Sequence, residues 1–440
     1  MVRRVSRREF NLGLAGLVGG LAVGCAQTGT PAPAVGQQPA QPTFPKEVKI
    51  GAIYPLTGPA ASSGLDGRYG IELAVEIVNG KYDLNLPLAR EEGLPNLGGA
   101  KITVVWADSQ GSPEKGQAEA ERLITQEKVV ALTGAYHSSV TATASQVAER
   151  LGVPYVNFES SSPSLTERGF KWFFRTGPHD ATFGKNLFDM LRDLERVKGI
   201  KVRTIGIVNE NTLYGTDASK ITKQYAQEYG YQVVVDIAYP ANTSDVTSEV
   251  QRIKAANPDV LFQVSYTSDL ILFIRTYKQL DYTPQMILGY GAGFVDPQYT
   301  KTLGKDADYA ITRAAWSADI TQKRPAAKVI ADMFQQRFGQ PMTENSARSF
   351  TGMLVLADAI NRAKSLEAEA IRQALLATNI PGDQTVMPWQ GVKFDEKTHQ
   401  NIYAQGVNLQ IIGGQYYTVW PFDLATREIV WPMPRWSQRQ

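Results

Sequence analysis

The stretch VVALTGAYHSSVTATASQVAERLGVPYVNFESSSP, residues 129–163, holds two strand-like runs with a helix-like segment between them. Val129–Thr133 and Pro154–Phe158 are short and largely apolar, as strands buried on both faces of a sheet are. Between them, residues 139–151 carry apolar side chains at helical spacing. A strand, a helix and a second strand in this order predict a parallel βαβ unit.

The same alternation continues on both sides of this stretch. Further strands are expected at 48–53, 102–106, 204–208, 232–237, 260–264 and 286–288. Further helices are expected near 64–79, 114–127, 181–197, 215–229, 243–256, 267–279, 326–338, 347–364 and 367–377. These are too many strands for one ordinary sheet, so the sequence predicts an α/β protein with two doubly wound parallel-sheet lobes. Residues 81–99 lack a clear period and are expected to be a surface insertion.

Hydroxyl-bearing residues follow both strands of the opening stretch. Ser138 and Ser139 begin the helix after the first strand, and Glu159, Ser160 and Ser161 follow the second. Doubly wound sheets bind ligands beyond the carboxyl ends of their strands, where both loops would lie. Free N–H groups at a helix start favour an anion. The two serines after the first strand can equally be helix caps with no ligand.

Tyrosines occupy comparable positions in the second half of the chain. Tyr214, Tyr266 and Tyr290 each follow a predicted strand. A tyrosine there can simply cover the edge of the core. Opposite the serine loops, the three rings would instead form the aromatic wall of a small-molecule cleft.

The composition is that of a soluble globular protein, and the sequence contains no G-x-S-x-G, P-loop or H-E-x-x-H motif of an enzyme. Apolar residues make up 43% and charged residues 20% of the chain, with no basic stripe of the kind that binds phosphates. The only histidines are His137, His179 and His399, and none has metal-ligand spacing. We therefore expect no catalysis, no cofactor, no metal and no nucleic-acid partner.

The N-terminus has the composition of an export signal. Four arginines and one glutamate give residues 1–25 a net charge of +3, whereas the whole chain has a net charge of only +2. The arginines precede an apolar run of 13 residues, which is too short to span a bilayer. Residues 6–10 resemble the twin-arginine motif, and Ala22-Val23-Gly24-Cys25 resembles a lipobox. Cys25, the only cysteine, is therefore the expected lipid anchor, the alternative being an ordinary signal peptide. Residues 26–46 predict a disordered Pro/Ala/Gln tether.

Several stretches together resemble the branched-chain amino-acid-binding proteins of ABC importers, which have the type I periplasmic-binding fold. In the family's order they are 55–59, 107–109, 113–114, 135–139, 162–169, 174–176, 211–215, 394–395 and 413–415. The resemblance implies two lobes joined by three crossovers, near 176–180, 311–318 and 386–392. Lobe 1 would be 47–177 plus 318–388, and lobe 2 would be 178–315 plus 390–432.

The resemblance also implies roles for individual residues. Ser138 matches the serine that holds the ligand carboxylate, Ser161 a hydroxyl that holds the ammonium or carboxylate group, and Ser63 a position that contributes to closure. Tyr214 and Tyr266 match aromatic contacts from the second lobe. The full set of expected ligand-binding residues is Ser63, Tyr136, His137, Ser138, Ser139, Glu159, Ser160, Ser161, Tyr214, Tyr266, Tyr290 and Gly291.

One departure concerns the ligand's ammonium group. The family's amino-acid binders place an acidic residue after the strand 286–288, whereas this chain has Gly291 there. A buried ammonium without a carboxylate partner is costly. Either Glu159 replaces the missing acid, or the ligand is an acid or amide without an ammonium. Trp316, Tyr136 and the other aromatic residues suggest a roomy pocket, although Trp316 can also be hinge packing.

The function that the resemblance implies is solute capture for an ABC importer. The protein would be an exported monomer that touches the membrane only through its lipid and delivers solute to the permease and its ATPases. A ligand-sensing receptor of the same fold is the alternative, as is an importer component specific for an aromatic acid or amide. A DNA-binding regulator of the same fold would need an N-terminal helix-turn-helix where the export signal stands.

Overall fold

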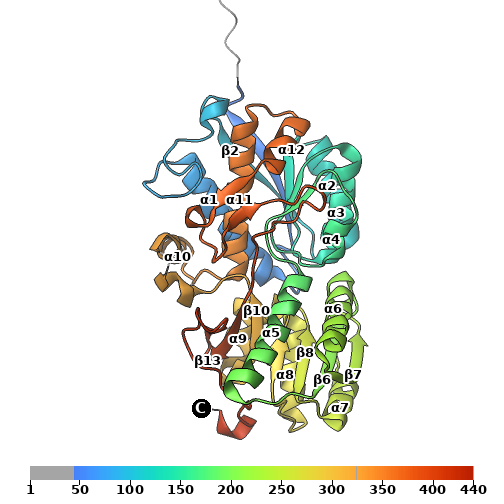
Figure 1. The fold of residues 1–440 in the computed structure, drawn as a ribbon. Helices are drawn as coiled ribbons and strands as arrows, with labels where there is room; N and C mark the ends of the chain where they lie inside the picture. Colours follow the sequence, from blue (N-terminus) through green and yellow to red (C-terminus); the bar gives the residue numbers. More distant parts are fainter. Residues whose placement is uncertain (1–43, 324, 440) are drawn as a thin grey trace, which may run out of the picture. The chain divides into compact units, whose positions relative to one another are not determined.

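The computed structural model describes residues 44–323 and 325–439. The predicted export signal, Cys25 and nearly all of the tether therefore lie outside the described residues. The described part is built around two large sheets (Figure 1). Within it, no helix is both long and apolar enough to cross a membrane.

The first sheet has five parallel strands in the order β2-β1-β3-β4-β5. They are β1 (Glu47–Tyr54), β2 (Lys101–Asp108), β3 (Ala131–Gly134), β4 (Tyr155–Asn157) and β5 (Phe173–Arg175). Adjacent residues enter different cores, since Tyr155 packs in one hydrophobic cluster and Val156 in another. This alternation is what a strand covered on both faces requires.

Helices cover both faces of the first sheet. On one face, α1 (Ala61–Asn79), α10 (Pro325–Phe338), α11 (Glu344–Ala363) and α12 (Ala368–Leu376) share a core with the strands, and α1 lies alongside α11 (Figure 1). On the other, α2 (Pro113–Thr125), α3 (Ser138–Leu151) and the short α4 (Ser164–Glu167) do so. Late segments of the chain thus complete the core that the first 175 residues begin.

The second sheet has seven strands in the order β14-β13-β10-β9-β8-β6-β7. The parallel strands are β6 (Thr204–Glu210), β7 (Gln232–Tyr239), β8 (Val260–Val264), β9 (Ile287–Gly289) and β10 (Ile311–Ala314). β13 (Val407–Ile412) and β14 (Gln415–Trp420) extend the sheet as an antiparallel hairpin. The helices of this part are α5 (Asp180–Lys198), α6 (Leu213–Tyr229), α7 (Thr247–Ala256), α8 (Thr267–Gln279) and α9 (Pro297–Leu303).

Shorter elements connect these parts. β11 (Asn379–Pro381) pairs with β12 (Gly391–Lys393) in a two-stranded sheet. The 3₁₀ turns are Pro95–Leu97, Ala292–Val295, Gly304–Ala307, Ala318–Lys323, Gly382–Gln384 and Trp436–Gln438. Phe394 and Ala404 still pack in the core around the first sheet, and the chain enters the second sheet at Val407.

The structure contains short elements that were not expected, such as β5, β11, β12 and α9, and it differs from the sequence-based expectations in three further segments. The supposed surface insertion at 81–99 buries Leu86, Leu94 and Leu97 in the core of the first sheet, because the strand-free segment folds back over α1 and α11. Residues 311–314, expected as part of a crossover, form an interior strand of the second sheet, β10. The hairpin β13–β14 was not among the expected strands, although residues 407–411 alternate between apolar and polar side chains as a strand does.

Candidate functional site

A small cavity lies where the loops after both sheets meet. Its volume is about 20 Å³, room for about one water molecule. Eleven residues line it: Tyr136, Ser138, Glu159, Ser161, Tyr214, Tyr266, Ala292, Arg313, Glu344, Asn345 and Arg348. Six of them are among the residues expected from the sequence. The cavity is bounded from both halves of the chain, as a cleft between two lobes would be.

The loop after β3 presents Tyr136 and Ser138. Gly134 can turn sharply there because it has no side chain: its φ is +114°, and a Cβ would lie 2.0 Å from the Ile53 carbonyl oxygen. The Ala135 N–H donates to the Thr141 hydroxyl at 3.0 Å, which ties the loop to the start of α3. This arrangement brings the first residue of α3, Ser138, to the cavity wall.

The loop after β4 presents Glu159 and Ser161 but turns Ser160 away from the cavity. The Ser160 hydroxyl donates to the Tyr136 carbonyl at 2.9 Å, so Ser160 joins the two loops rather than lining the cleft. Ser161 lies at the centre of a charged network, donating to Asp180 at 3.0 Å and accepting from Arg313 at 3.1 Å. Both loops are therefore held rigidly in place.

Glu159 faces the cavity with one oxygen committed and one free. Its Oε1 accepts hydrogen bonds from Tyr54, at 2.8 Å, and from Ser349. Its Oε2 is buried and has no hydrogen-bond partner among the described residues. Burial raises the pKa of Glu159, and the hydrogen bond from Ser349 and the charge of Arg348 offset this only in part. The free oxygen is the acceptor that a ligand N–H group would meet.

The aromatic wall consists of Tyr136, Tyr214 and Tyr266, and His137 packs against it. Tyr266 contacts three of these rings, at centroid distances of 4.6 Å to His137, 5.2 Å to Tyr214 and 5.9 Å to Tyr136. Burial lowers the pKa of His137 to about 4, so the imidazole is neutral near pH 7 and acts as an aromatic ring. His137 lies behind the wall, since it does not line the cavity itself.

The remaining expected residues lie outside the cavity. Ser139 is half-buried on α3, and Tyr290 points into the second lobe, where its hydroxyl bonds to Thr222 at 2.7 Å. Ser63 donates to Asp296, which also accepts from Ser62 at 2.7 Å. Because Ser62 and Ser63 belong to α1 and Asp296 precedes α9, these bonds link the two halves of the chain.

The guanidinium of Arg313 occupies the space in which a side chain at position 291 would lie. A Cβ on Gly291 would lie 2.4 Å from Nη1 of Arg313, so the glycine leaves room for the guanidinium. Arg313 donates to Glu344 at 3.0 Å and to Asp180 at 3.2 Å, and it lies over the Phe183 ring with 3.9 Å between its Cζ and the ring centroid. The position where relatives are expected to carry an acid is thus covered by a buried cation.

Sequence reasoning missed Arg313, Glu344, Asn345 and Arg348. Glu344 and Arg348 stand one turn apart on α11, a helix buried on almost every side, and they pair at 3.2 Å. Arg348 also donates to the Glu159 carbonyl at 2.7 Å and so positions that loop. Charged residues within such a buried helix were the available signal, because charges are rarely buried without a partner.

Four polar groups on cavity-lining residues lack partners. In addition to Glu159 Oε2, the hydroxyl of Tyr136, the Nε of Arg313 and the Nδ2 of Asn345 are buried and make no hydrogen bond within the described part of the chain. Buried polar groups are nearly always paired, so unpaired ones on a cavity-lining residue suit a ligand. Two donors, one acceptor and one hydroxyl that can do either are thus available. No cluster of three His, Cys, Asp or Glu side chains that could hold a metal occurs among residues 44–323 and 325–439.

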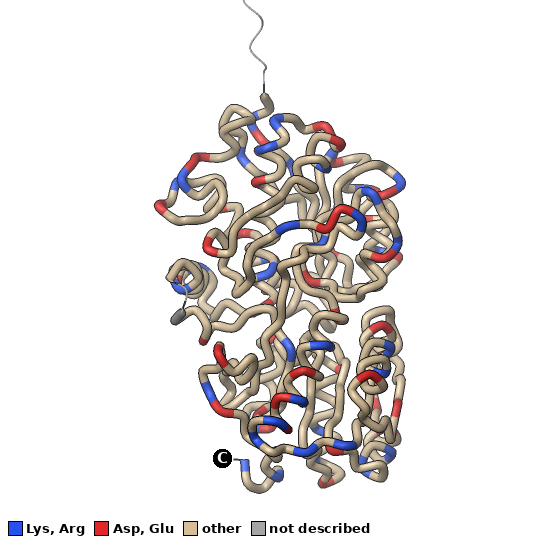
Figure 2. Tube along the Cα trace, in the orientation of Figure 1, with Lys and Arg blue, Asp and Glu red and all other residues tan. Residues whose placement is uncertain are grey.

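Positively and negatively charged residues are interspersed along the described chain (Figure 2), in agreement with the balanced composition of the sequence.

Comparison with known proteins identifies the family of the chain. The periplasmic binding protein family matches residues 47–409, and the chain belongs to that family. The Leu/Ile/Val-binding protein homolog 7 of Brucella suis biovar 1 (strain 1330) is 31% identical over 396 residues, covering 88% of this chain and 94% of that protein. The resemblance to branched-chain amino-acid-binding proteins is therefore confirmed.

Solved structures support the fold. The leucine-binding protein LivK from Thermotoga maritima MSB8 has a TM-score of 0.72 at 22% identity and covers 84% of this chain and 97% of its own. A solute-binding protein of an ABC transporter from Rhodopseudomonas palustris BisB5, in complex with 3,4-dihydroxybenzoic acid, has a TM-score of 0.70 at 20% identity. The match covers 85% of this chain and 96% of that protein. The predicted type I periplasmic-binding fold is confirmed.

Proposed function

We propose that this protein is the extracytoplasmic solute-binding component of an ABC importer and that it binds a small carboxylate- or amide-bearing solute between its two lobes. The observation that carries this proposal is the cavity between the two sheets, with unpaired donors and an unpaired acceptor on its lining residues. Binding, not catalysis, suits such a site, since its charged groups are tied to one another.

Each end of the solute has a matching set of groups. Ser138, Ser161 and the Asn345 amide would hold the carboxylate or carbonyl oxygens. Glu159 Oε2 would accept a hydrogen bond from an ammonium or amide N–H, and Glu159 would thus replace the acidic residue expected at position 291, where this chain has glycine. Asp180 and Glu344 together offset the charges of Arg313 and Arg348, so a solute with both an ammonium and a carboxylate would add no net charge to the cleft.

The two lobes would close on the solute like a hinge. We place lobe 1 at 47–177 plus 318–404 and lobe 2 at 178–315 plus 407–432, and so move the third crossover from the expected 386–392 to just before Val407, because Phe394 and Ala404 still pack in the core of the first sheet. Ser63 and its neighbour would stabilise closure through Asp296. The closed pair of lobes would then present the solute to the permease.

Export and anchoring complete the proposal. Residues 1–25 would direct export, acylated Cys25 would anchor the protein, and residues 26–46 would tether the folded part to the membrane. Its partners would be the permease and the ATPases. A receptor that senses the same solute remains the alternative, and a gene neighbourhood encoding permease and ATPase subunits would favour transport.

A second solute class is an aromatic acid or amide without an ammonium group. It is favoured by the wall of Tyr136, Tyr214 and Tyr266 and by Arg313 at the place of the expected acid. A protein of similar fold has been solved with 3,4-dihydroxybenzoic acid, although at 20% identity that likeness shows the fold alone.

Thermal unfolding of the purified protein against a panel of solutes tests the proposal. A solute at 100 times its Kd stabilises the native state by about 2.7 kcal/mol, a clear shift in Tm. The panel contains leucine, isoleucine, benzoate, 3,4-dihydroxybenzoate and simple amides, and each is repeated with Glu159→Gln. A shift with leucine that Glu159→Gln reduces would identify Glu159 as the ammonium partner. A shift with aromatic acids alone, unchanged in Glu159→Gln, would favour the second class. The absence of any shift would contradict the proposed site.

A further inference from the structure

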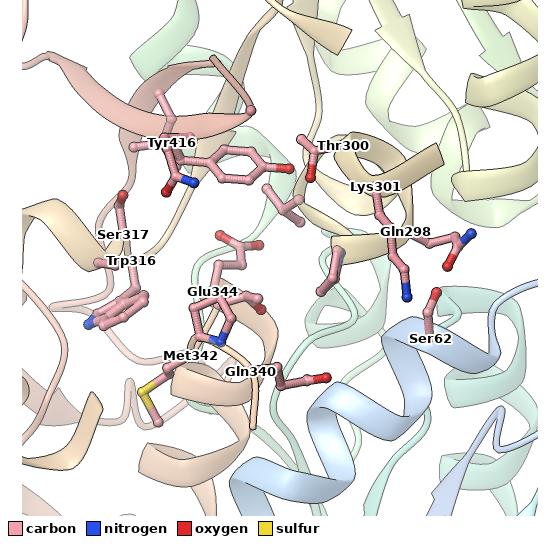
Figure 3. A pocket seen from close by; sticks show the side chains of 18 of the residues that line it. Ser62, Gln298, Thr300, Lys301, Trp316, Ser317, Gln340, Met342, Glu344 and Tyr416 are labelled. Carbon is pink, nitrogen blue, oxygen red and sulfur yellow. The ribbon is translucent and has the colours of Figure 1, made fainter. Parts of the chain in front are cut away.

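A second and much larger cavity adjoins the small one. Its volume is about 590 Å³, which falls in the range of cavities that enclose drug-sized ligands. A branched-chain amino acid would fill only part of such a space. Glu344 lines both cavities, so the two lie on either side of one side chain. Figure 3 shows Glu344 between Trp316 and Met342 on one side and Lys301 and Ser62 on the other.

The larger cavity offers both apolar and amide-like surfaces. Trp316 and Met342 give it a buried apolar side, and the Trp316 indole N–H is already bonded to the Val386 carbonyl. Gln340 and Gln415 add carboxamides, which can both donate and accept. These are the features that a chain of peptide groups with side chains would match.

Two polar groups of the larger cavity are free to bind a ligand. Ser317 is only 3% exposed, and its hydroxyl has no hydrogen-bond partner among the described residues. Lys301 lines the same cavity, and no acidic residue pairs with it in the described part of the chain. The cavity thus has an unpaired hydroxyl deep inside and an unpaired cation at its α9 side.

Contacts between the two halves of the chain separate the cavities. Ser62 lines the larger cavity and bonds to Asp296 across the halves, and Arg313 and Glu344 pair across them near the smaller one. Opening the lobes would break these contacts and join the two spaces. A solute captured in the open state could then occupy both.

From this geometry we propose that the solute is a short peptide of two or three residues rather than a single amino acid; the inference rests on the proposed function. Once opening of the lobes has enlarged the small cavity beyond its present volume of about 20 Å³, the N-terminal ammonium meets Glu159, and the first peptide carbonyl meets Ser138 and Ser161. The following residues lie in the larger cavity, with peptide groups at Ser317 and the carboxamides. The C-terminal carboxylate lies at Lys301, the unpaired cation.

Isothermal titration of the purified protein with leucine, Leu-Gly-Gly and C-terminally amidated Leu-Gly-Gly tests this inference. We expect the free-acid tripeptide to bind at least about tenfold more tightly than leucine, because it gains the contacts of the larger cavity. Lys301→Glu should weaken binding of the free acid about three- to tenfold, the size expected of a largely exposed charge pair. The amidated peptide, which has no carboxylate for Lys301, should change little.

Lys305→Glu is the matched control, since Lys305 is an exposed lysine four residues further along the chain that does not line the cavity. It should leave all three affinities unchanged. Binding of leucine without binding of either peptide would overturn the peptide inference and leave the proposed function standing. Equal losses for the free acid and the amide in Lys301→Glu would overturn the placement of the C-terminus. Binding of none of the three, while an aromatic acid binds, would overturn the inference and favour the second solute class.

Discussion

At the scale of single residues, Ser138 and Ser161 have different surroundings although both line the small cavity. The Ser138 hydroxyl accepts only a long bond, 3.4 Å from the Ser162 N–H, so most of its hydrogen-bonding capacity is available to a solute. Ser161 is already shared between Asp180 and Arg313. Loss of Ser161 therefore disturbs the network as well as the solute contact.

We expect Ser138→Ala and Ser161→Ala each to weaken solute binding by about 1–3 kcal/mol, the cost of an unmade buried hydrogen bond. Ser161→Ala should also lower the Tm, because Arg313 loses a partner. Titration with whichever solute gives a thermal shift measures the first effect. Ser139→Ala, on the same helix but outside the cavity, is the control and should bind normally. Unchanged affinity in both variants would argue against this cleft.

Substitution of Gly291 can separate the effect of backbone strain on stability from the effect of the Arg313 position on solute binding. Its backbone has φ +73° and ψ −128°, a conformation that other residues rarely adopt, and its side-chain space belongs to Arg313. Gly304 has a similar backbone, with φ +52° and ψ −130°, but open space around it.

We therefore expect Gly291→Ala and Gly304→Ala to lose about 1–3 kcal/mol of stability each from backbone strain. Only Gly291→Ala should also reduce solute affinity, because the added methyl group displaces Arg313 from Glu344 and Ser161. Denaturant unfolding gives the first quantity and titration the second. Normal binding in Gly291→Ala would show that the position of Arg313 does not matter to the solute.

At the scale of elements, a buried carboxyl joins α1 to the start of α11. Asp66 on α1 accepts from the Thr343 hydroxyl and from the Ser346 N–H at 3.1 Å, which satisfies free groups at the N-terminus of α11. Burial raises the pKa of Asp66 from its ordinary value of 3.8 to about 7. The folded protein therefore keeps this proton over a range where the unfolded chain has lost it.

This difference predicts a stability that falls as pH rises. Between about pH 4 and 7 the native state binds one more proton than the unfolded state at Asp66, so the free energy of unfolding decreases with rising pH across this window. Asp66→Asn keeps an acceptor but cannot ionise, and its Tm relative to wild type should rise steadily from pH 4 to pH 7. Parallel Tm profiles for the two proteins would show that Asp66 does not titrate in this range.

The sequence predicts individual elements better than the contacts between elements. The periodic helix 267–279 was expected at the bounds that α8 has, and the βαβ unit around Ser138 was expected within a few residues. Local apolar spacing is enough for such elements. It does not reveal that Arg313 of β10 and Glu344 of α11 meet in the cleft, because 31 residues separate them in the chain.

The same limit explains the remaining differences at the candidate site. Ser160 and Tyr290 belong to loops that do reach the cavity edge, but their side chains bond to Tyr136 and Thr222 instead. Which side of a loop faces a ligand depends on backbone turns and distant partners. Loop position was therefore predictable from the pattern, whereas side-chain direction was not.

At the scale of the whole folded part, capture of a solute depends on contacts that exist only when the two halves meet. The Asp296 carboxylate accepts hydrogen bonds from the hydroxyls of Ser62 and Ser63 on α1. It also accepts one from the Thr267 hydroxyl, at 2.7 Å, within its own half. The α1 hydroxyls are therefore the part of this cluster that opening would remove. These bonds stabilise the closed arrangement, and a solute that binds this arrangement therefore binds more tightly when they are present.

We expect the double variant Ser62→Ala/Ser63→Ala to destabilise the closed arrangement by about 1–3 kcal/mol, the value of hydrogen bonds to a charged acceptor. Solute affinity should fall by about tenfold for each 1.4 kcal/mol, and the solute should reduce the radius of gyration in small-angle X-ray scattering less than it does in wild type. Ser268→Ala, which removes a hydroxyl bonded only to Asp269 in the same half, is the control and should behave as wild type. If the double variant compacts and binds as wild type does, closure draws its stability from the solute and the Arg313 network alone, and the role assigned to Ser63 is wrong.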